Sequence, residues 1–226
     1  MPNFDELQVF LEKHFPGELS EDQLFQFKTA FSAYLDWNTK VNLVSRKDLE
    51  NLAERHFLHS LSIAKCIRFA QGTQILDIGT GGGFPGIPLA IFFPESRFHL
   101  VDSIQKKIRV VQDVSNQAGL TNVLATVQRA ETVKGQFDFV VSRAVAALPK
   151  FIPWAHHRIH CRSKNSLANG ILYLKGMSVL EELKEMEKAS FSGKQNMKAP
   201  QIMPLNVHFS EPYFSSKCLV HIPFCK

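Results

Sequence analysis

The stretch ILDIGTGGGFPGIP, from Ile75 to Pro88, decides the fold of this chain. It begins with apolar, β-branched residues typical of a buried strand, continues with four glycines in five residues (79–83), and ends in the start of a helical pattern. A turn with few Cβ atoms can take positive φ and bring its backbone N–H groups close to a ligand at a helix N-terminus. A tight turn without a ligand is the less favoured interpretation, because four glycines cost backbone entropy.

Two aspartates flank these glycines and indicate the kind of ligand. Asp102 ends the next apolar strand, about 20 residues beyond the glycines, where an acid can accept hydrogen bonds from ribose hydroxyls. Asp77 lies inside the first strand, where an acid suits a positively charged cofactor, and the bulky Phe84 leaves little room for a pyrophosphate. The pattern therefore resembles the first motif of the class I S-adenosylmethionine (SAM) methyltransferases.

From Gln74 onward the chain alternates between strand and helix patterns, which indicates a parallel sheet with helical crossovers. The expected strands are 74–79, 97–102, 123–128, 137–142 and 170–175, and the expected helices lie near 85–93, 104–118, 147–158 and 178–189. Apolar runs at 202–209 and 219–222 predict a C-terminal antiparallel hairpin. We expect an α/β, Rossmann-like class I methyltransferase core over 71–226, with seven mostly parallel strands and a helical appendage over 1–70.

Composition narrows the class of protein. The chain has 226 residues and a net charge of +5, which favours an acidic partner. Its four cysteines are scattered without C-x-x-C spacing, as expected in a reducing compartment. The acidic, amphipathic N-terminus does not resemble a signal peptide, and no apolar run approaches the ~20 residues that cross a membrane. We expect a cytoplasmic, monomeric protein without a membrane or metal partner.

The carboxyl ends of the parallel strands should line one cleft, because ligands bind there in open α/β sheets. After the glycine turn, the strand ends carry Asp102, then Ala130 and Glu131, then Arg143, then Lys175. Glu131 is expected either to accept from an adenine amino group or to cap a turn. An arginine at the end of a buried strand needs a partner, so we expect Arg143 to pair with a carboxylate or to hold a substrate base or phosphate.

Basic residues occur in two further segments. Lys106, Lys107 and Arg109 lie on the first turns of the helix predicted at 104–118, where cations oppose the helix dipole and contact with phosphate would explain them. The segment 150–164 is rich in His, Lys and Arg, but its helix should lead away from the cleft. No Asp or Glu accompanies its histidines, so we expect an exposed basic loop and no metal site.

Together these motifs resemble the bacterial glucose-inhibited division protein B family. The resemblance rests on DIGTGGGFPGIPLAI, LVDSIQKKIRVV, FDFVVSRAVAAL and LYLKG, with RHFLHSL upstream, and it covers roughly residues 38–180. It implies a SAM-dependent methyltransferase acting on N7 of guanine 527 in the 530 loop of 16S ribosomal RNA. The residues it places against SAM or the catalytic cleft are Gly79, Gly81, Phe84, Asp102 (ribose), Ala130, Glu131 and Arg143. The residues expected to meet RNA are Lys106, Lys107, Arg109 and Lys175.

Missing motifs agree with this chemistry. The sequence has no Ser-His-Asp pattern, no nucleophilic Cys motif and no phosphate-binding G-x-x-x-x-G-K-[ST]. Methyl transfer from a sulfonium mainly requires alignment, and a ring nitrogen with a free lone pair needs no general base. The open alternatives are a methyltransferase of another RNA, protein or small molecule, an NAD-dependent oxidoreductase disfavoured by Asp77, and a non-catalytic RNA-binding or ribosome-assembly protein.

Overall fold

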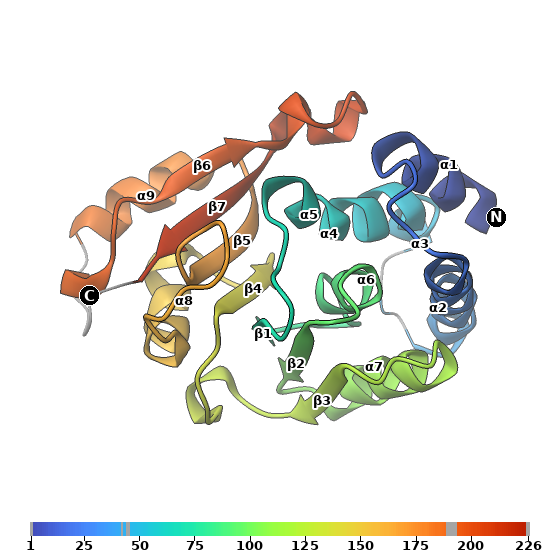
Figure 1. The fold of residues 1–226 in the computed structure, drawn as a ribbon, viewed down its shortest axis with the longest axis horizontal. Coiled ribbons are helices and arrows are strands. Elements are labelled where there is room, and N and C mark those ends of the chain that lie inside the picture. Colours follow the sequence, from blue (N-terminus) through green and yellow to red (C-terminus); the bar gives the residue numbers. More distant parts are fainter. Residues whose placement is uncertain (1, 42, 44–45, 189–193, 225–226) are drawn as a thin grey trace.

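A computed structural model describes residues 2–41, 43, 46–188 and 194–224. Figure 1 shows a twisted sheet with helices on both faces, and its seven strands lie in the order β3-β2-β1-β4-β5-β7-β6. The strands are β1 Gln74–Ile78, β2 Arg97–Asp102, β3 Val123–Val127, β4 Phe139–Arg143, β5 Gly170–Gly176, β6 Gln201–Pro204 and β7 Lys217–Pro223. The strands β1 to β5 are parallel to one another, whereas β7 runs antiparallel to β5 and β6. The predicted fold class is confirmed.

The helices of the core follow the predicted alternation. They are α6 Gly86–Phe92, α7 Gln105–Gln117, α8 Leu148–Ala155 and α9 Val179–Lys188, with 3₁₀ turns at Ala130–Thr132, His156–Arg158, Lys194–Asn196, Leu205–Val207 and Pro212–Ser216. The N-terminal segment contains α1 Phe4–His14, α2 Glu21–Lys40, α3 Arg46–Leu49, a π-helix Leu52–Leu58, α4 His59–Leu61 and α5 Ile63–Cys66. The sequence pattern did not predict the π-helix. π-Helices are rare in proteins, and those that occur are often found at functional sites.

Alternation along the buried strands divides the core between the two faces of the sheet. In β1, Ile75 packs with α6, α7 and the N-terminal helices, whereas Leu76 packs with α8 and α9. This is the period-two pattern that a strand buried on both faces requires. The N-terminal helices therefore share one continuous core with the sheet.

Aromatic packing brings the N-terminal helices against the glycine turn. The ring of Phe84, at the end of that turn, lies 4.6 Å from the Tyr34 ring of α2 and 5.4 Å from the Phe57 ring of the π-helix, measured between centroids. Such tilted and edge-to-face pairs stabilise beyond the burial of their area. This cluster fixes the position of the π-helix relative to the strand ends.

Membrane-spanning helices and metal-ligand clusters are both missing from the described residues. None of their helices is both long and apolar enough to cross a membrane. Cys66 and Cys218 are free thiols, and Cys225 lies outside the described residues. No group of three His, Cys, Asp or Glu side chains in this part of the chain could hold a metal ion.

Candidate functional site

A cavity of about 690 Å³ opens beyond the carboxyl ends of β1, β2, β3 and β4. This is where the topology of a doubly wound sheet places a ligand, because the crossover after β1 leads to β2 on one side and the crossover after β3 returns to β4 on the other. The cavity brings together most of the predicted site residues: Gly79, Gly81, Phe84, Asp102, Lys107, Ala130, Glu131 and Arg143. Their convergence from four separate strand ends is the central feature of the site.

Two glycines of the turn are required for different reasons. Gly83 has φ +105°, and a Cβ added there would lie 2.6 Å from Tyr34 Oη and 2.7 Å from Ile87 Cγ1. Gly81 has φ +59°, but an added Cβ would meet no atom within 4 Å. Gly83 therefore allows close packing beneath the turn, whereas Gly81 lines the cavity with bare backbone that a ligand can approach.

Asp77 supports the turn from below and does not line the cavity. Its Oδ2 accepts from Thr80 Oγ1 at 2.7 Å and from the Gly86 N–H, at the start of α6, at 2.9 Å. Burial raises the pKa of this carboxyl to about 7, and its Oδ1 has no hydrogen-bond partner among the described residues. The interpretation of Asp77 as an acid facing a charged cofactor needs correction, because its side chain holds the turn in shape.

Asp102 lies at the end of β2 with both carboxylate oxygens already oriented. Oδ2 accepts from the Gly81 N–H at 3.0 Å, and Oδ1 accepts from the Ile104 N–H at 2.9 Å. Each oxygen keeps lone-pair capacity for a further donor, and Lys107 Nζ stands 3.9 Å from Oδ2. A carboxylate fixed in this way fits the paired hydroxyls of a ribose.

Ala130 and Glu131 form the rim of the cavity after β3. They begin the 3₁₀ turn Ala130–Thr132, and the Glu131 carbonyl accepts from Arg158 Nη2 at 3.2 Å. The Glu131 side chain is exposed beside the cavity and does not cap this turn. Contact of Glu131 with an adenine amino group therefore stays a prediction, consistent with its place at the rim.

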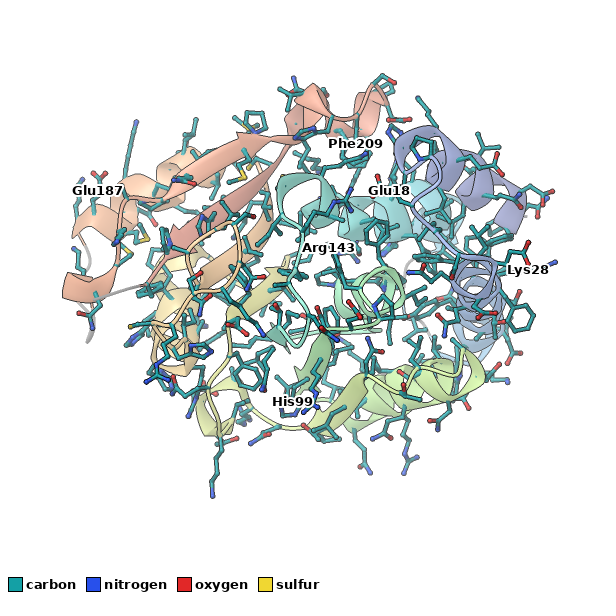
Figure 2. The ribbon with its side chains drawn as sticks, viewed as in Figure 1. Glu18, Lys28, His99, Arg143, Glu187 and Phe209 are labelled. Carbon is teal, nitrogen blue, oxygen red and sulfur yellow. The ribbon has the colours of Figure 1, made fainter. Side chains whose placement is uncertain are left out.

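Arg143 is held at the end of β4 by the π-helix. Its Nη1 donates to the Arg55 carbonyl at 2.8 Å, its Nη2 donates to His56 Nδ1 at 2.9 Å, and its guanidinium lies 5.3 Å from the centroid of the Phe84 ring. Figure 2 shows Arg143 near the centre of the molecule, where the sheet meets the N-terminal helices. The expected carboxylate partner is therefore replaced by a carbonyl and an imidazole.

His56 is a cavity residue that the strand-end argument missed. Burial, reinforced by the charge of Arg143, lowers the pKa of its imidazole to about 3. The ring is neutral at physiological pH. The motif RHFLHSL, which contributed to the family resemblance, was the sequence signal that contained it.

Lys175, Lys106 and Arg109 lie outside the cavity lining. Lys175 Nζ bonds the Glu182 carboxylate at 2.9 Å and the Ala146 carbonyl at 2.8 Å. The expectation that all five strand ends line one cleft is wrong for β5, because this ion pair ties its end to α9. Lys106 and Arg109 are exposed on α7.

Lys150 and Trp154 correct the prediction for the segment 150–164. Both line the cavity from α8, with Lys150 Nζ 5.9 Å from the centroid of the Trp154 ring. Because α8 starts within a few residues of the end of β4, its first turns still border the site before the helix leads away. Part of the segment treated as an exposed basic loop therefore forms a wall of the cavity.

Comparisons with known proteins agree with this geometry. The family model described as rRNA small subunit methyltransferase G matches residues 23–206. Proteins named ribosomal RNA small subunit methyltransferase G are similar to the chain: the one from Flavobacterium psychrophilum is 49% identical and the one from Bacteroides fragilis strain ATCC 25285 is 48% identical. These matches cover 93% and 94% of this chain and 95% and 98% of the relatives.

Solved structures share the fold at low sequence identity. Ribosomal protein L11 methylase from Lactobacillus delbrueckii subsp. bulgaricus superposes with a TM-score of 0.54 at 13% identity, covering 75% of this chain and 77% of the other. TYW2 of M. jannaschii, solved in complex with AdoMet, gives 0.53 at 14% identity and covers 81% and 77%. These likenesses show the sheet architecture.

Proposed function

The chain belongs to the rRNA small subunit methyltransferase G family, and from this premise we propose how its residues perform the reaction. It is a SAM-dependent methyltransferase whose acceptor is N7 of a guanine in 16S ribosomal RNA. By the family resemblance, the acceptor is guanine 527 of the 530 loop. The observation that supports the residue assignment is the convergence of the bare glycine turn, Asp102 and Arg143 on one cavity.

The cofactor side of the cavity consists of the ends of β1, β2 and β3. When bound there, SAM supplies a methyl group made electrophilic by its positively charged sulfur. Asp102 would accept hydrogen bonds from the ribose hydroxyls with the lone pairs left by Gly81 and Ile104. The backbone of Gly79 and Gly81 would line the methionine portion, and Ala130 with Glu131 would contact the adenine.

The acceptor side is formed by Phe84, Arg143 and His56, between the end of β4 and the π-helix. Guanine N7 has a lone pair in the plane of the ring, so no residue has to remove a proton before attack. The bound cofactor would supply the methyl group to N7, and the electron pair of its carbon–sulfur bond would remain on sulfur. The residues on this side therefore act by alignment and exclusion of water. Arg143, which borders both sides, positions the acceptor.

Contacts with the rest of the RNA require cations outside the cavity. We assign this role to Lys106 and Arg109 on the exposed face of α7, with Lys107 at the cavity edge. The appendage over 1–70 extends the docking surface of the core over 71–226. Lys175, engaged by Glu182, contributes through the packing of α9 and not as a free cation. The protein acts as a cytoplasmic monomer.

Transfer of tritium from methyl-labelled SAM to RNA tests this function. The expected result is incorporation into 16S ribosomal RNA or small subunits from a strain that lacks the modification. The matched control is the same RNA from a modified strain, which should accept almost no label. Equal labelling of both RNAs, or of neither, would contradict the assignment.

A further inference from the structure

The chemistry of an N7 acceptor restricts how the protein can recognise guanine. The edge of guanine that carries N7 also carries O6, and both are hydrogen-bond acceptors. A donor bonded to N7 would occupy the lone pair that must attack the methyl group. A guanine-reading residue at this site therefore has to offer a donor to O6 and leave N7 open.

The bidentate grip by which arginine most often holds guanine does not meet this requirement. This grip uses two N–H groups, one on O6 and one on N7. In this structure the two terminal nitrogens of Arg143 donate to the Arg55 carbonyl and to His56 Nδ1, at 2.8 and 2.9 Å. One N–H of each terminal nitrogen is thus already bonded to the π-helix, which holds the guanidinium in place.

The bond from Arg143 also fixes the tautomer of His56. Arginine is a donor only, so Nδ1 of His56 must accept and the ring hydrogen must lie on Nε2. The low pKa of this imidazole keeps it in that neutral form. The ring lines the cavity and is held 5.2 Å from the Phe84 ring, between centroids. His56 therefore offers a single N–H donor on the acceptor side.

We propose that His56 selects guanine at the acceptor position by donating from Nε2 to O6 of the base. Adenine presents an amino group where guanine has O6, so two donors would face each other and adenine would be rejected. Arg143 is the positioning residue that sets the tautomer. This proposal rests on the proposed function, because it assumes that the acceptor base enters the side of the cavity formed by Phe84, Arg143 and His56.

Exchange of the target base measures this selection directly. Wild-type protein and His56→Gln are compared on RNA with guanine or adenine at the target position, because the amide of Gln can rotate to accept from an amino group. Sites that read a polar group reject its analogue by about 10⁴-fold. We expect His56→Gln to lower the guanine-to-adenine rate ratio by at least about 100-fold. His157→Gln, at an exposed histidine outside the cavity lining, should leave the ratio unchanged.

Removal of O6 alone provides the second measurement. 2-Aminopurine keeps N7 and lacks O6, so wild-type methylation should fall by about 10-fold or more, the equivalent of one hydrogen bond. In His56→Ala the same base change should have almost no further effect. An equal loss in wild type and variant would overturn the proposal, and so would an unchanged guanine-to-adenine ratio in His56→Gln.

SAM affinity separates this proposal from the function on which it rests. Calorimetry should give both His56 variants a dissociation constant within about threefold of wild type, since no cofactor contact is assigned to His56. Loss of SAM binding by both variants would overturn the selection role. Failure of wild-type protein to methylate guanine-containing RNA would instead overturn the proposed function.

Discussion

Asp102 and Gly81, 21 residues apart in the chain, are joined by a 3.0 Å hydrogen bond from the Gly81 N–H to Asp102 Oδ2. The bond links the end of β2 to the glycine turn after β1, the two sides of the proposed ribose site. Because Oδ1 is also fixed, by the Ile104 N–H, the carboxylate is oriented before any ligand arrives. Preorganisation of this kind reduces the entropy lost on binding.

Asp102→Asn should weaken SAM binding more than it destabilises the fold. The amide offers one acceptor atom where the carboxylate offers two, so either Gly81 or Ile104 would face an amino group. A hydrogen bond to a charged group contributes about 1.5–3 kcal/mol, so we expect the dissociation constant to rise about 10- to 100-fold in calorimetry. Asp36→Asn, at an exposed side chain of α2, is the control. Equal affinities for Asp102→Asn and wild type would contradict the ribose assignment.

Alanine substitutions at two glycines of the turn should impair different properties: Gly83→Ala mainly the stability of the fold, and Gly81→Ala mainly the affinity for SAM. Gly83→Ala meets Tyr34 and Ile87, so urea denaturation should show a loss about 1–3 kcal/mol greater than that of Gly81→Ala. Gly81→Ala has only the backbone penalty but places a methyl group in the cavity, so it should reduce SAM affinity. Gly17→Ala, with φ +68° and no atom within 4 Å, isolates the backbone penalty. Normal SAM affinity in Gly81→Ala would exclude a close approach of cofactor to this backbone.

Asp77 should make the free energy of unfolding fall as pH rises from about 4 to 7. Its folded pKa is about 7, whereas an unfolded aspartate titrates near 3.9. Between these values only the folded state retains the proton, so a higher pH favours unfolding. Relative to Asp77→Asn, which cannot titrate, wild type should lose up to about 4 kcal/mol over this range.

Urea denaturation of wild type and Asp77→Asn at several pH values measures this difference. The two stability curves should converge at low pH and separate towards neutrality, while Asp36→Asn parallels wild type throughout. Curves of wild type and Asp77→Asn that remain parallel would show that Asp77 stays ionised in the fold.

Arg143→Lys should reduce methylation of RNA by about 10- to 100-fold, more than it reduces SAM affinity. A lysine is a point charge without the planar fork, so it cannot satisfy the Arg55 carbonyl and His56 Nδ1 in the same geometry. Rates at saturating SAM, combined with calorimetry, separate the two effects. Arg97→Lys, at the exposed amino end of β2, is the control. Full activity in Arg143→Ala would remove Arg143 from the site.

The double variant Lys106→Gln, Arg109→Gln should bind RNA more weakly, and its affinity should depend less steeply on salt concentration. If each cation neutralises one phosphate, the double variant should lower the slope of log affinity against log salt by about 1.4–1.8. Lys184→Gln with Lys188→Gln, exposed on α9, removes the same charge elsewhere. Identical slopes for the two double variants would place the RNA on another surface.

Much of the fold was predictable because its signals are local. The apolar run, the glycines and the following helix around Ile75–Pro88 require a strand, a turn and a helix from backbone physics alone. Asp102 could be identified from the sequence because one crossover helix joins the two adjacent parallel strands. The length of that crossover fixes the number of residues between the glycine turn and the end of the next strand. Gly79, Gly81, Phe84 and Glu131 reached the cavity for the same topological reason.

Other features depended on contacts between segments that are distant in sequence. His56 meets Arg143 across 87 residues, and no periodicity in either segment indicates that the π-helix turns its carbonyl and imidazole towards β4. Lys175 has the right position for the cleft but bonds Glu182 of α9, and Lys150 reaches the cavity from a segment interpreted as solvent-exposed.

The sequence by itself determined the class of sheet, the glycine turn and the acid beyond it, because each follows from residues close together in the chain or from fixed topological spacing. Only the tertiary structure decided which polar groups neighbour each other around Arg143 and which way Asp77 faces. The physical reason is that hydrogen bonding and burial of a side chain depend on the elements packed against it, and that packing joins segments whose local patterns are independent.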